Sequence, residues 1–321
     1  MRIRNRQQEE TKLSQPATNS ALPDVGFLGP GAMGSGMVFR LLEAGYQVRV
    51  WARNPQKLKP FTDAGATIGT TLEDVVGSSD IVLGCLLDTA VIRETYLGPG
   101  GIVESARPGQ LFAEHATFDP DLAREILHAL GERGANFADA PVSGGPRGAR
   151  EGTLVSMIGA DAPAMEALTP ILDSYCSRLV HIGGIGSGLK VKLINQLLVS
   201  THALAAAEAA ALVHASGIDP EVAHNALMGG WAASTMLDMQ LPAACAREFD
   251  GGGASIGGLI EVQRLVAALM AEADVDSALL DPTRRAFDTA VDAGHGGHSL
   301  AALVTNYAAN NPAAGAVMVN P

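Results

Sequence analysis

The sequence predicts an α/β protein in which a doubly wound parallel sheet is followed by an all-helical domain. Up to about residue 187, short apolar segments alternate with helical patterns, which is typical of a parallel sheet covered by helices on both faces. One long helical pattern then begins, and only helical patterns follow it. We therefore expect a flexible tail over residues 1–23, the sheet domain over 24–187 and the helical domain over 188–321.

Composition narrows the class of protein. With 321 residues, of which 47% are hydrophobic and 17% charged, the chain is expected to be soluble and to build two domains. A formal net charge of −12 argues against nucleic acid or an anionic membrane as a partner, and we expect no apolar run of transmembrane length. Three isolated cysteines form neither a zinc spacing nor a disulfide framework, which favours the cytoplasm. The polar N-terminal residues do not resemble a secretory signal, and a targeting peptide is the alternative to a flexible tail.

A glycine-rich turn opens the predicted sheet domain. The apolar strand Val25–Leu28 runs into GPGAMG, a G-x-G-x-x-G pattern, and the helical pattern Ser35–Ala44 follows. In a Rossmann-type domain the first glycine permits the tight turn, the second lets the backbone approach a pyrophosphate, and the third lets helix and strand pack closely. The helix N-terminus then offers N–H groups to the phosphates. The predicted cofactor-binding residues of this turn are Gly29, Gly31, Ala32, Met33 and Gly34.

The end of the next strand indicates which dinucleotide binds. The strand Gln47–Trp51 is followed by Ala52-Arg53-Asn54, and no acidic residue stands between Tyr46 and Phe61. An acid would accept hydrogen bonds from the ribose of NAD, whereas arginine pairs with the 2′-phosphate of NADP. The sequence therefore predicts Arg53 as a cofactor contact and NADP rather than NAD; the alternative is a solvated loop arginine.

Further predicted strands deliver more candidates at their carboxyl ends, where ligands of such sheets bind. These strands are Ala66–Gly69, Asp80–Leu87, Gln110–Ala113 and Asn136–Pro141, and strands at Thr153–Gly159 and Arg178–Ile182 flank the helix Ala162–Leu172. Leu86 and Leu87 are expected beside the cofactor ribose, and Thr117 near the nicotinamide. His115 also follows a strand, but a histidine there is more often structural and is not a candidate.

A turn of small residues follows the strand that ends near Pro141. Ser143, Gly144 and Gly145 expose successive backbone N–H groups, which can form an anion-binding nest, and the serine adds its hydroxyl. A substrate carboxylate would fit this turn. The alternative is an ordinary glycine-rich connection.

The long helical pattern runs from Leu189 to Ser216 and would span roughly 40 Å at 1.5 Å per residue. Most of its faces are apolar, so we expect it to be buried nearly all round, between two domains or two subunits. Lys192, Asn195 and Gln196 share one of its faces. Burial would lower the pKa of the lysine towards the range useful for proton transfer; alternatively, its stem reaches out to water.

Four segments, in order, resemble the β-hydroxyacid dehydrogenase family, which includes 3-hydroxyisobutyrate, tartronate semialdehyde and threonate-type enzymes. They are GFLGPGAMG, ATFDP at Ala116–Pro120, DAPVSGGPRGAREGTL at Asp139–Leu154 and GSGLKVKLINQ at Gly186–Gln196. The resemblance covers residues 25 to 310. It implies that Lys192 is the catalytic residue, that the turn at Ser143 binds the substrate carboxylate, and that homodimers or homotetramers form on the helical part.

The chain also departs from that family's pattern. Asn195 matches the first of two paired asparagines, but Gln196 stands at the second. A Lys-Asp pair common in a later helix has no counterpart, because Gly257–Val262 contains no lysine. Lys190 falls on another helix face and is expected to be a surface cation. The remaining expected helices are Pro220–Leu227, Ser234–Ala246, Ile256–Glu272, Pro282–Ala293 and Ser299–Ala309.

The resulting hypothesis is an NADP-dependent oxidoreductase acting on a small hydroxy acid or semialdehyde of the 3-hydroxyisobutyrate type. Lys192 would move the hydroxyl proton, and Ser143, Gly144, Gly145, Asn195 and Gln196 would bind the substrate. No metal is expected, since His295 and His298 lack a third ligand in the sequence nearby. Two alternatives are an imine or ketone reductase of related fold, which usually lacks this lysine, and a non-catalytic NADP-binding scaffold.

Overall fold

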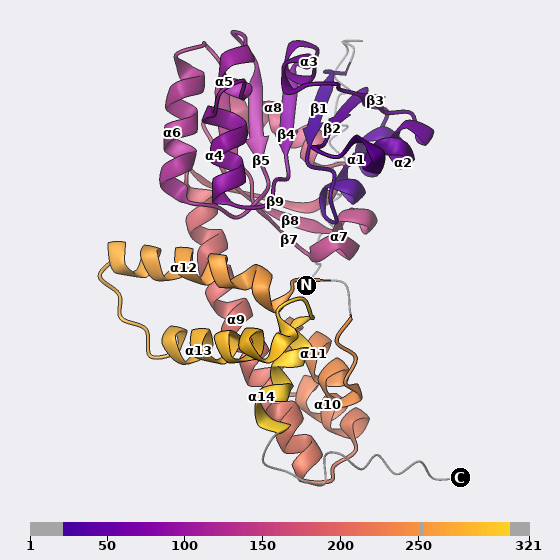
Figure 1. The fold of residues 1–321 in the computed structure, drawn as a ribbon, viewed down its shortest axis with the longest axis vertical. Helices are drawn as coiled ribbons and strands as arrows, with labels where there is room; N and C mark the ends of the chain where they lie inside the picture. The colour runs from indigo at the N-terminus through magenta and orange to yellow at the C-terminus, as the bar shows by residue number, and fades with distance from the viewer. Residues whose placement is uncertain (1–21, 251–252, 309–321) are drawn as a thin grey trace, which may run out of the picture.

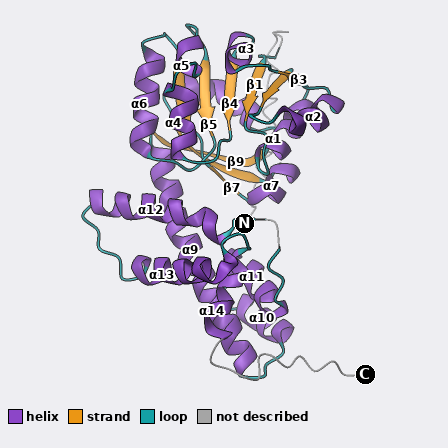
Figure 2. Cartoon of the chain, viewed as in Figure 1, coloured by secondary structure: helices purple, strands orange, loops and turns teal. Residues whose placement is uncertain are grey.

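The computed structural model describes residues 22–250 and 253–308, which form two lobes (Figure 1). The upper lobe holds all the strands, and the lower lobe is built of helices (Figure 2). The helix α9 (Ser187–Ala215) leaves the upper lobe and runs the length of the lower one. The predicted fold class is confirmed: a doubly wound sheet domain is followed by an all-α domain that begins with one long helix.

The sheet has the strand order β3-β2-β1-β4-β5-β6-β8-β7, with β9 paired to β8. Neighbours from β3 to β6 are parallel, so this part has the doubly wound order 3-2-1-4-5-6. The strand β8 runs antiparallel to β6 and β7 and parallel to β9, which the sequence did not predict. The strands are β1 (Val25–Leu28), β2 (Val48–Trp51), β3 (Thr67–Ile68), β4 (Ile81–Gly84), β5 (Leu111–Glu114), β6 (Asn136–Asp139), β7 (Val142–Ser143), β8 (Leu154–Gly159) and β9 (Cys176–Gly183).

Helices cover both faces of this sheet. Apolar side chains of α1, α7 and α8 pack in one core cluster with β1 and β2, and those of α3 to α6 pack in a second cluster on the other face. Fully buried strands such as β1, β4 and β5 follow from this two-sided cover. The helical segments are α1 (Gly34–Glu43), the 3₁₀ turn η1 (Pro55–Leu58), α2 (Lys59–Asp63), α3 (Leu72–Gly77), α4 (Thr89–Leu97), α5 (Ile102–Ser105), α6 (Pro120–Gly131), α7 (Gly145–Glu151) and α8 (Ala162–Leu172).

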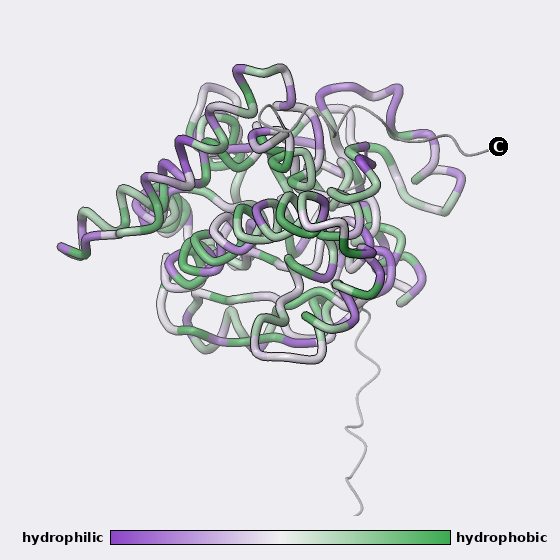
Figure 3. Tube along the Cα trace, turned by 90° about the horizontal axis from the view of Figure 1, so that it is seen from below, coloured by the Kyte–Doolittle hydropathy of each residue, from purple (hydrophilic) through white to green (hydrophobic). Residues whose placement is uncertain are grey.

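The lower lobe packs around α9. Apolar and polar residues alternate along its helices (Figure 3), and three core clusters join them to α9. The segments are α10 (Pro220–Met228), α11 (Thr235–Ala246), α12 (Ile256–Glu272), α13 (Leu280–Ala290), the π-turn η2 (Val291–His295), the 3₁₀ segment η3 (Leu300–Val304) and α14 (Thr305–Ala308). The predicted helix Ser299–Ala309 is therefore a 3₁₀ segment and a short α-helix, and its last residue lies outside the described part of the chain.

The structure bears on two expectations about the long helix. Within one chain α9 is buried on one face only, because Ile194, Leu198 and Leu212 on the opposite face are about half or more exposed. By length and composition α9 could also span a membrane, contrary to the expectation that no apolar run is long enough. The core helix of a water-soluble protein meets the same criterion, and α9 packs against β8, α11 and α12.

Candidate functional site

The predicted site residues gather where the parallel strands end. In Figure 1 the carboxyl ends of β1, β4 and β5 point towards the helical domain, and α9 starts on the same side. Ligands of doubly wound sheets bind at this edge. The glycine turn follows β1, Arg53 follows β2, Leu86 follows β4, Thr117 follows β5, and the turn at Ser143 follows β6.

The turn between β1 and α1 has the backbone that a dinucleotide loop requires. Gly29 has φ 77°, and a Cβ there would lie 2.6 Å from the Cys85 carbonyl oxygen. A Cβ on Gly34 would lie 2.5 Å from the Gly29 carbonyl oxygen, so both positions need glycine for packing. Gly31 differs, because a Cβ there would meet nothing nearer than 4.0 Å. The space above Gly31 is therefore open for a ligand.

Donor groups at the start of α1 remain available to that ligand. Met33, the residue before α1, makes no side-chain capping bond. Among the described residues, the backbone N–H groups of Ala32 and Met33 take part in no recorded hydrogen bond. Unsatisfied N–H groups and the positive end of the helix dipole form a phosphate site. The residues present thus fit the pyrophosphate of a dinucleotide.

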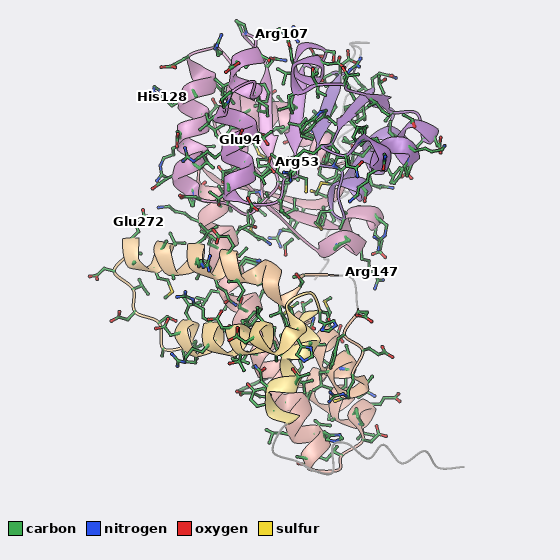
Figure 4. All side chains as sticks on the ribbon, viewed as in Figure 1. Arg53, Glu94, Arg107, His128, Arg147 and Glu272 are labelled. Atoms are coloured by element: carbon green, nitrogen blue, oxygen red, sulfur yellow. The ribbon has the colours of Figure 1, made fainter. Side chains whose placement is uncertain are left out.

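Arg53 follows β2 and lies near the middle of the upper lobe, above α7 in the view of Figure 4. Its side chain is exposed and forms no ion pair with another described residue. The nearby Arg49 instead pairs with Asp74 at 3.4 Å. Asn54 accepts a hydrogen bond from the Gln56 N–H at 3.0 Å and so begins η1. Arg53 is the arginine of this strand end that is free to meet a phosphate.

The strand β4 is shorter than predicted, so Cys85, Leu86 and Leu87 lie beyond its end. The Leu86 N–H donates to Glu114 Oε1 at 3.1 Å, and the Ala116 N–H donates to the same oxygen at 3.0 Å. One buried carboxylate therefore holds the loop after β4 and the segment leading to Thr117. Burial raises the pKa of Glu114 to about 7, against the effect of these N–H donors.

The turn at Ser143 lies beside the glycine turn. Gly144 and Gly145 have φ 132° and 67°, and α7 begins at Gly145. A Cβ on Gly36 of α1 would lie 2.7 Å from the backbone carbon of Ala149, so the first turn of α1 touches the second turn of α7. The predicted carboxylate turn and the predicted pyrophosphate turn therefore open on neighbouring helices. The helix α7 itself was not predicted, because its glycines resemble a loop.

Lys192 is buried inside the junction of the two lobes. Its side chain is 7% exposed, and burial lowers its pKa from 10.5 to about 8. No hydrogen bond or ion pair of its ammonium group is recorded among the described residues. Lys190, in contrast, pairs with Glu272 of α12 at 3.0 Å and is partly exposed, which confirms it as a surface cation. A lysine in Lys192's position can exchange a proton near neutral pH.

The two amides expected near Lys192 bond to each other. The Asn195 Nδ2 donates to Gln196 Oε1 at 3.0 Å, and both side chains are partly buried. This bond leaves the Asn195 carbonyl oxygen and the Gln196 amide group free for another partner. The two residues thus present one acceptor and one donor group on the same helix as Lys192.

Other candidates in the sequence have structural roles. His115 is buried, bonds the Ala140 carbonyl at 2.8 Å and the Tyr175 hydroxyl at 2.9 Å, and burial lowers its pKa to about 4. Glu261, in the segment Gly257–Val262 that contains no lysine, is exposed and accepts from Arg264 at 3.2 Å. His295 and His298 lie 3.0 Å apart, and the described residues contain no group of three side chains able to hold a metal.

Comparisons with known proteins match both lobes. Residues 24–183 match the NAD-binding domain of 6-phosphogluconate dehydrogenase, and residues 186–307 match the NAD-binding domain of NADP-dependent 3-hydroxyisobutyrate dehydrogenase. The chain is 32% identical to 2-hydroxy-3-oxopropionate reductase of Escherichia coli over 71% of this chain and 78% of that protein. The chain belongs to the β-hydroxyacid dehydrogenase family. The predicted resemblance is thereby confirmed, and with it a domain that binds NAD or NADP.

Relatives of this family member carry several names. An uncharacterised oxidoreductase of Synechocystis is 36% identical over 71% of this chain and 79% of the relative. A human cytokine-like nuclear factor, N-PAC, is 32% identical over 67% of this chain but only 39% of its own length. Among solved structures, 3-hydroxyisobutyrate dehydrogenase from Salmonella typhimurium has a TM-score of 0.81 at 27% identity, covering 88% of this chain and 99% of that one. An imine reductase from Pseudomonas has a TM-score of 0.60 at 21% identity, a likeness of fold alone.

One feature of the candidate site was not predicted. Asp139, the last residue of β6, is fully buried and pairs across the sheet with Glu114, the last residue of β5. Burial raises the pKa of Asp139 to about 7, although backbone N–H groups donate to its carboxylate. The available signal was a carboxylate at the end of each of two neighbouring apolar strands, directly before candidate site residues.

Proposed function

We propose that this protein is an NADP-dependent dehydrogenase of small hydroxy acids or the matching semialdehydes, and that Lys192 is its general acid–base. The observation that carries the proposal is the buried lysine, with its pKa lowered to about 8, at the junction between the strand ends and the helical lobe. A general acid–base works best when its pKa lies near the working pH. The relative named 2-hydroxy-3-oxopropionate reductase supports a short carboxylate substrate.

The roles divide among the chain's own residues. The nicotinamide, when bound, supplies or accepts the hydride at the carbinol carbon. The N–H groups of the turn at Ser143 hold the substrate carboxylate. Asn195 and Gln196 orient the hydroxyl oxygens with the acceptor and donor they leave free. Lys192 takes the hydroxyl proton in oxidation and returns it in reduction.

The test is the absorbance of the reduced nicotinamide with a panel of substrates. The panel contains 3-hydroxyisobutyrate, glycerate, threonate, 4-hydroxybutyrate and their oxo partners, each with NADP(H) and NAD(H). We expect turnover of at least one short hydroxy acid, with kcat lower by a factor of about 10²–10⁴ in Lys192→Ala. Reduction of cyclic imines without turnover of any hydroxy acid would favour the imine reductase alternative. NADPH binding without turnover of either class would favour a non-catalytic NADP-binding scaffold. The relative named as a nuclear factor is the reason to test this alternative.

We propose NADP rather than NAD because Arg53 is exposed at the end of β2, and no acid lies near it in the sequence. Removal of the guanidinium should weaken NADP⁺ binding about 10- to 100-fold, since a charge-assisted hydrogen bond contributes about 1.5–3 kcal/mol. NAD⁺ has no 2′-phosphate, so its dissociation constant should not change. Titration of Arg53→Ala with both cofactors checks this prediction. Arg93→Ala, which removes an arginine paired with Glu125 at 2.7 Å, is the control. Equal weakening of both cofactors would contradict the assignment.

We also propose that the protein is a homodimer or homotetramer built on the helical lobe. Ile194, Leu198 and Leu212 line one exposed stripe of α9 and are 54%, 49% and 67% exposed. A second copy of the chain would bury this apolar stripe. The apolar residues on most faces of α9 predict such burial. Light scattering should give at least twice the mass of one chain, and Ile194→Asp/Leu198→Asp should reduce it. A monomeric wild-type protein would overturn this proposal.

A further inference from the structure

The helix that carries Lys192 is capped by a side chain from a distant part of the chain. Asp139 Oδ1 accepts a hydrogen bond from the Gly186 N–H at 2.6 Å, and Oδ2 accepts one from the Leu189 N–H at 2.8 Å. Gly186, the residue before α9, has no side chain with which to cap it. The first N–H groups of a helix need such a partner when they are buried. Asp139 supplies it from the end of β6.

Two glycines leave the space that the Asp139 carboxylate occupies. A Cβ on Gly159 of β8 would lie 2.3 Å from Asp139 Oδ1. A Cβ on Gly188 of α9 would lie 2.8 Å from Oδ2 and 2.3 Å from the Met157 carbonyl oxygen. Glycine at both positions lets β6, β8 and α9 approach around the carboxylate. The first turn of α9 is therefore fixed against the sheet at this point.

Asp139 also connects the parts of the candidate site. The chain runs from it directly through Ala140–Val142 into the turn at Ser143. In the other direction, Leu189, whose N–H it holds, lies three residues before Lys192 on the same rigid helix. One side chain thus joins the proposed carboxylate turn to the proposed acid–base. A shift of the first turn of α9 would move the Lys192 ammonium relative to the bound substrate.

We propose that Asp139 is a positioning residue of the reaction, which holds Lys192 in register with the substrate turn through the first turn of α9. This proposal rests on the proposed acid–base role of Lys192. A misplacement of about 1 Å at a reacting group can cost about 10²-fold in rate. The alternative is that Asp139 only stabilises the fold.

The experiment uses Asp139→Asn, which keeps the shape but replaces one acceptor oxygen with an amide that opposes an N–H group. We expect kcat to fall about 10- to 100-fold, with the dissociation constant of NADPH unchanged. The decisive measurement repeats the substitution in the Lys192→Ala background. If Asp139 acts through Lys192, Asp139→Asn should have no further effect on the residual kcat there. A residue that only stabilises the fold would lower kcat in both backgrounds by the same factor.

A matched control removes a helix cap elsewhere in the same lobe. Asp161 caps α8 by accepting from the Ala164 N–H at 2.8 Å, and Asp161→Ala should lower the melting temperature while kcat is kept. If Asp139→Asn does not fold, Asp139→Ser, which is smaller and still accepts one N–H, should give the same loss and the same non-additivity. Wild-type kcat in the Asp139 variants while Lys192→Ala is inactive would overturn this inference alone. Full activity of Lys192→Ala would overturn the proposed function instead.

Discussion

Replacement of Lys192 with alanine should lower kcat by a factor of about 10²–10⁴, the usual contribution of general acid–base catalysis. The reason is that the buried amine, with its pKa near 8, is the proposed proton carrier next to the reacting carbon. NADPH binding should not change, because the pyrophosphate turn lies on α1 and not on α9. Stopped-flow or steady-state turnover together with an NADPH titration checks both statements.

The matched control is Lys190→Ala on the same helix. Lys190 pairs with Glu272 at 3.0 Å, and both side chains are partly exposed, so its loss should leave kcat unchanged. An equal effect of the two alanine variants would mean that α9 needs positive charge in general and not a specific acid–base. Wild-type turnover of Lys192→Ala would remove the lysine from the mechanism.

The turnover of oxidation and that of reduction should change with pH in opposite directions. Oxidation requires the neutral amine, so kcat for oxidation should rise as pH increases through about 8. Reduction requires the ammonium form, so its kcat should fall through the same pH. The same shift affects stability: a lysine whose pKa is lowered on folding destabilises the native state below about pH 8, and this cost disappears as pH rises to 10.5. Lys192→Met should therefore raise the melting temperature at pH 7 while it abolishes turnover.

The order of the site along the sheet could be predicted from sequence because each strand ended in a distinctive residue type. The glycine turn, the Arg53 loop and the turn at Ser143 follow β1, β2 and β6 as expected. The family resemblance indicated Lys192 rather than Lys190, and helical periodicity places these two residues on different faces. Sequence predicts features of this kind well, because they depend on local backbone geometry and not on contacts with distant residues.

The buried carboxylates of Glu114 and Asp139 and the one-sided burial of α9 could not be predicted, because they depend on contacts between distant elements. The donors to Asp139 come from residues about fifty positions later, and the Leu86 N–H reaches Glu114 from the loop after the neighbouring strand β4. Hydrogen bonds between elements depend on their packing, which no single-sequence pattern encodes. Similarly, the apolar residues of α9 do not reveal whether their cover comes from the same chain. The large side chains of Ile194, Leu198 and Leu212, exposed in the single chain, show where that cover is missing.

Gly31→Ala should leave the protein as stable as the wild type but weaken NADP(H) binding by about 10- to 100-fold or more. In the chain alone a Cβ at this position meets nothing nearer than 4.0 Å, and Gly31 is not among the glycines with positive φ. The fold of the chain alone therefore does not require glycine at position 31. The second glycine of a dinucleotide turn is needed for the close approach of the pyrophosphate to the backbone. The melting temperature without cofactor and the dissociation constant of NADPH separate the two effects.

Two further glycine variants serve as controls for Gly31→Ala. Gly34→Ala would place its Cβ 2.5 Å from the Gly29 carbonyl oxygen, so it should lower both stability and cofactor affinity. Gly77→Ala, at the end of α3 with nothing within 4 Å, should change neither affinity nor turnover. Loss of affinity in Gly31→Ala at unchanged melting temperature would show that a ligand and not the fold requires this glycine. Unchanged affinity would mean that the pyrophosphate does not cross the turn at Gly31, and the unbonded N–H groups of Ala32 and Met33 would then need another partner.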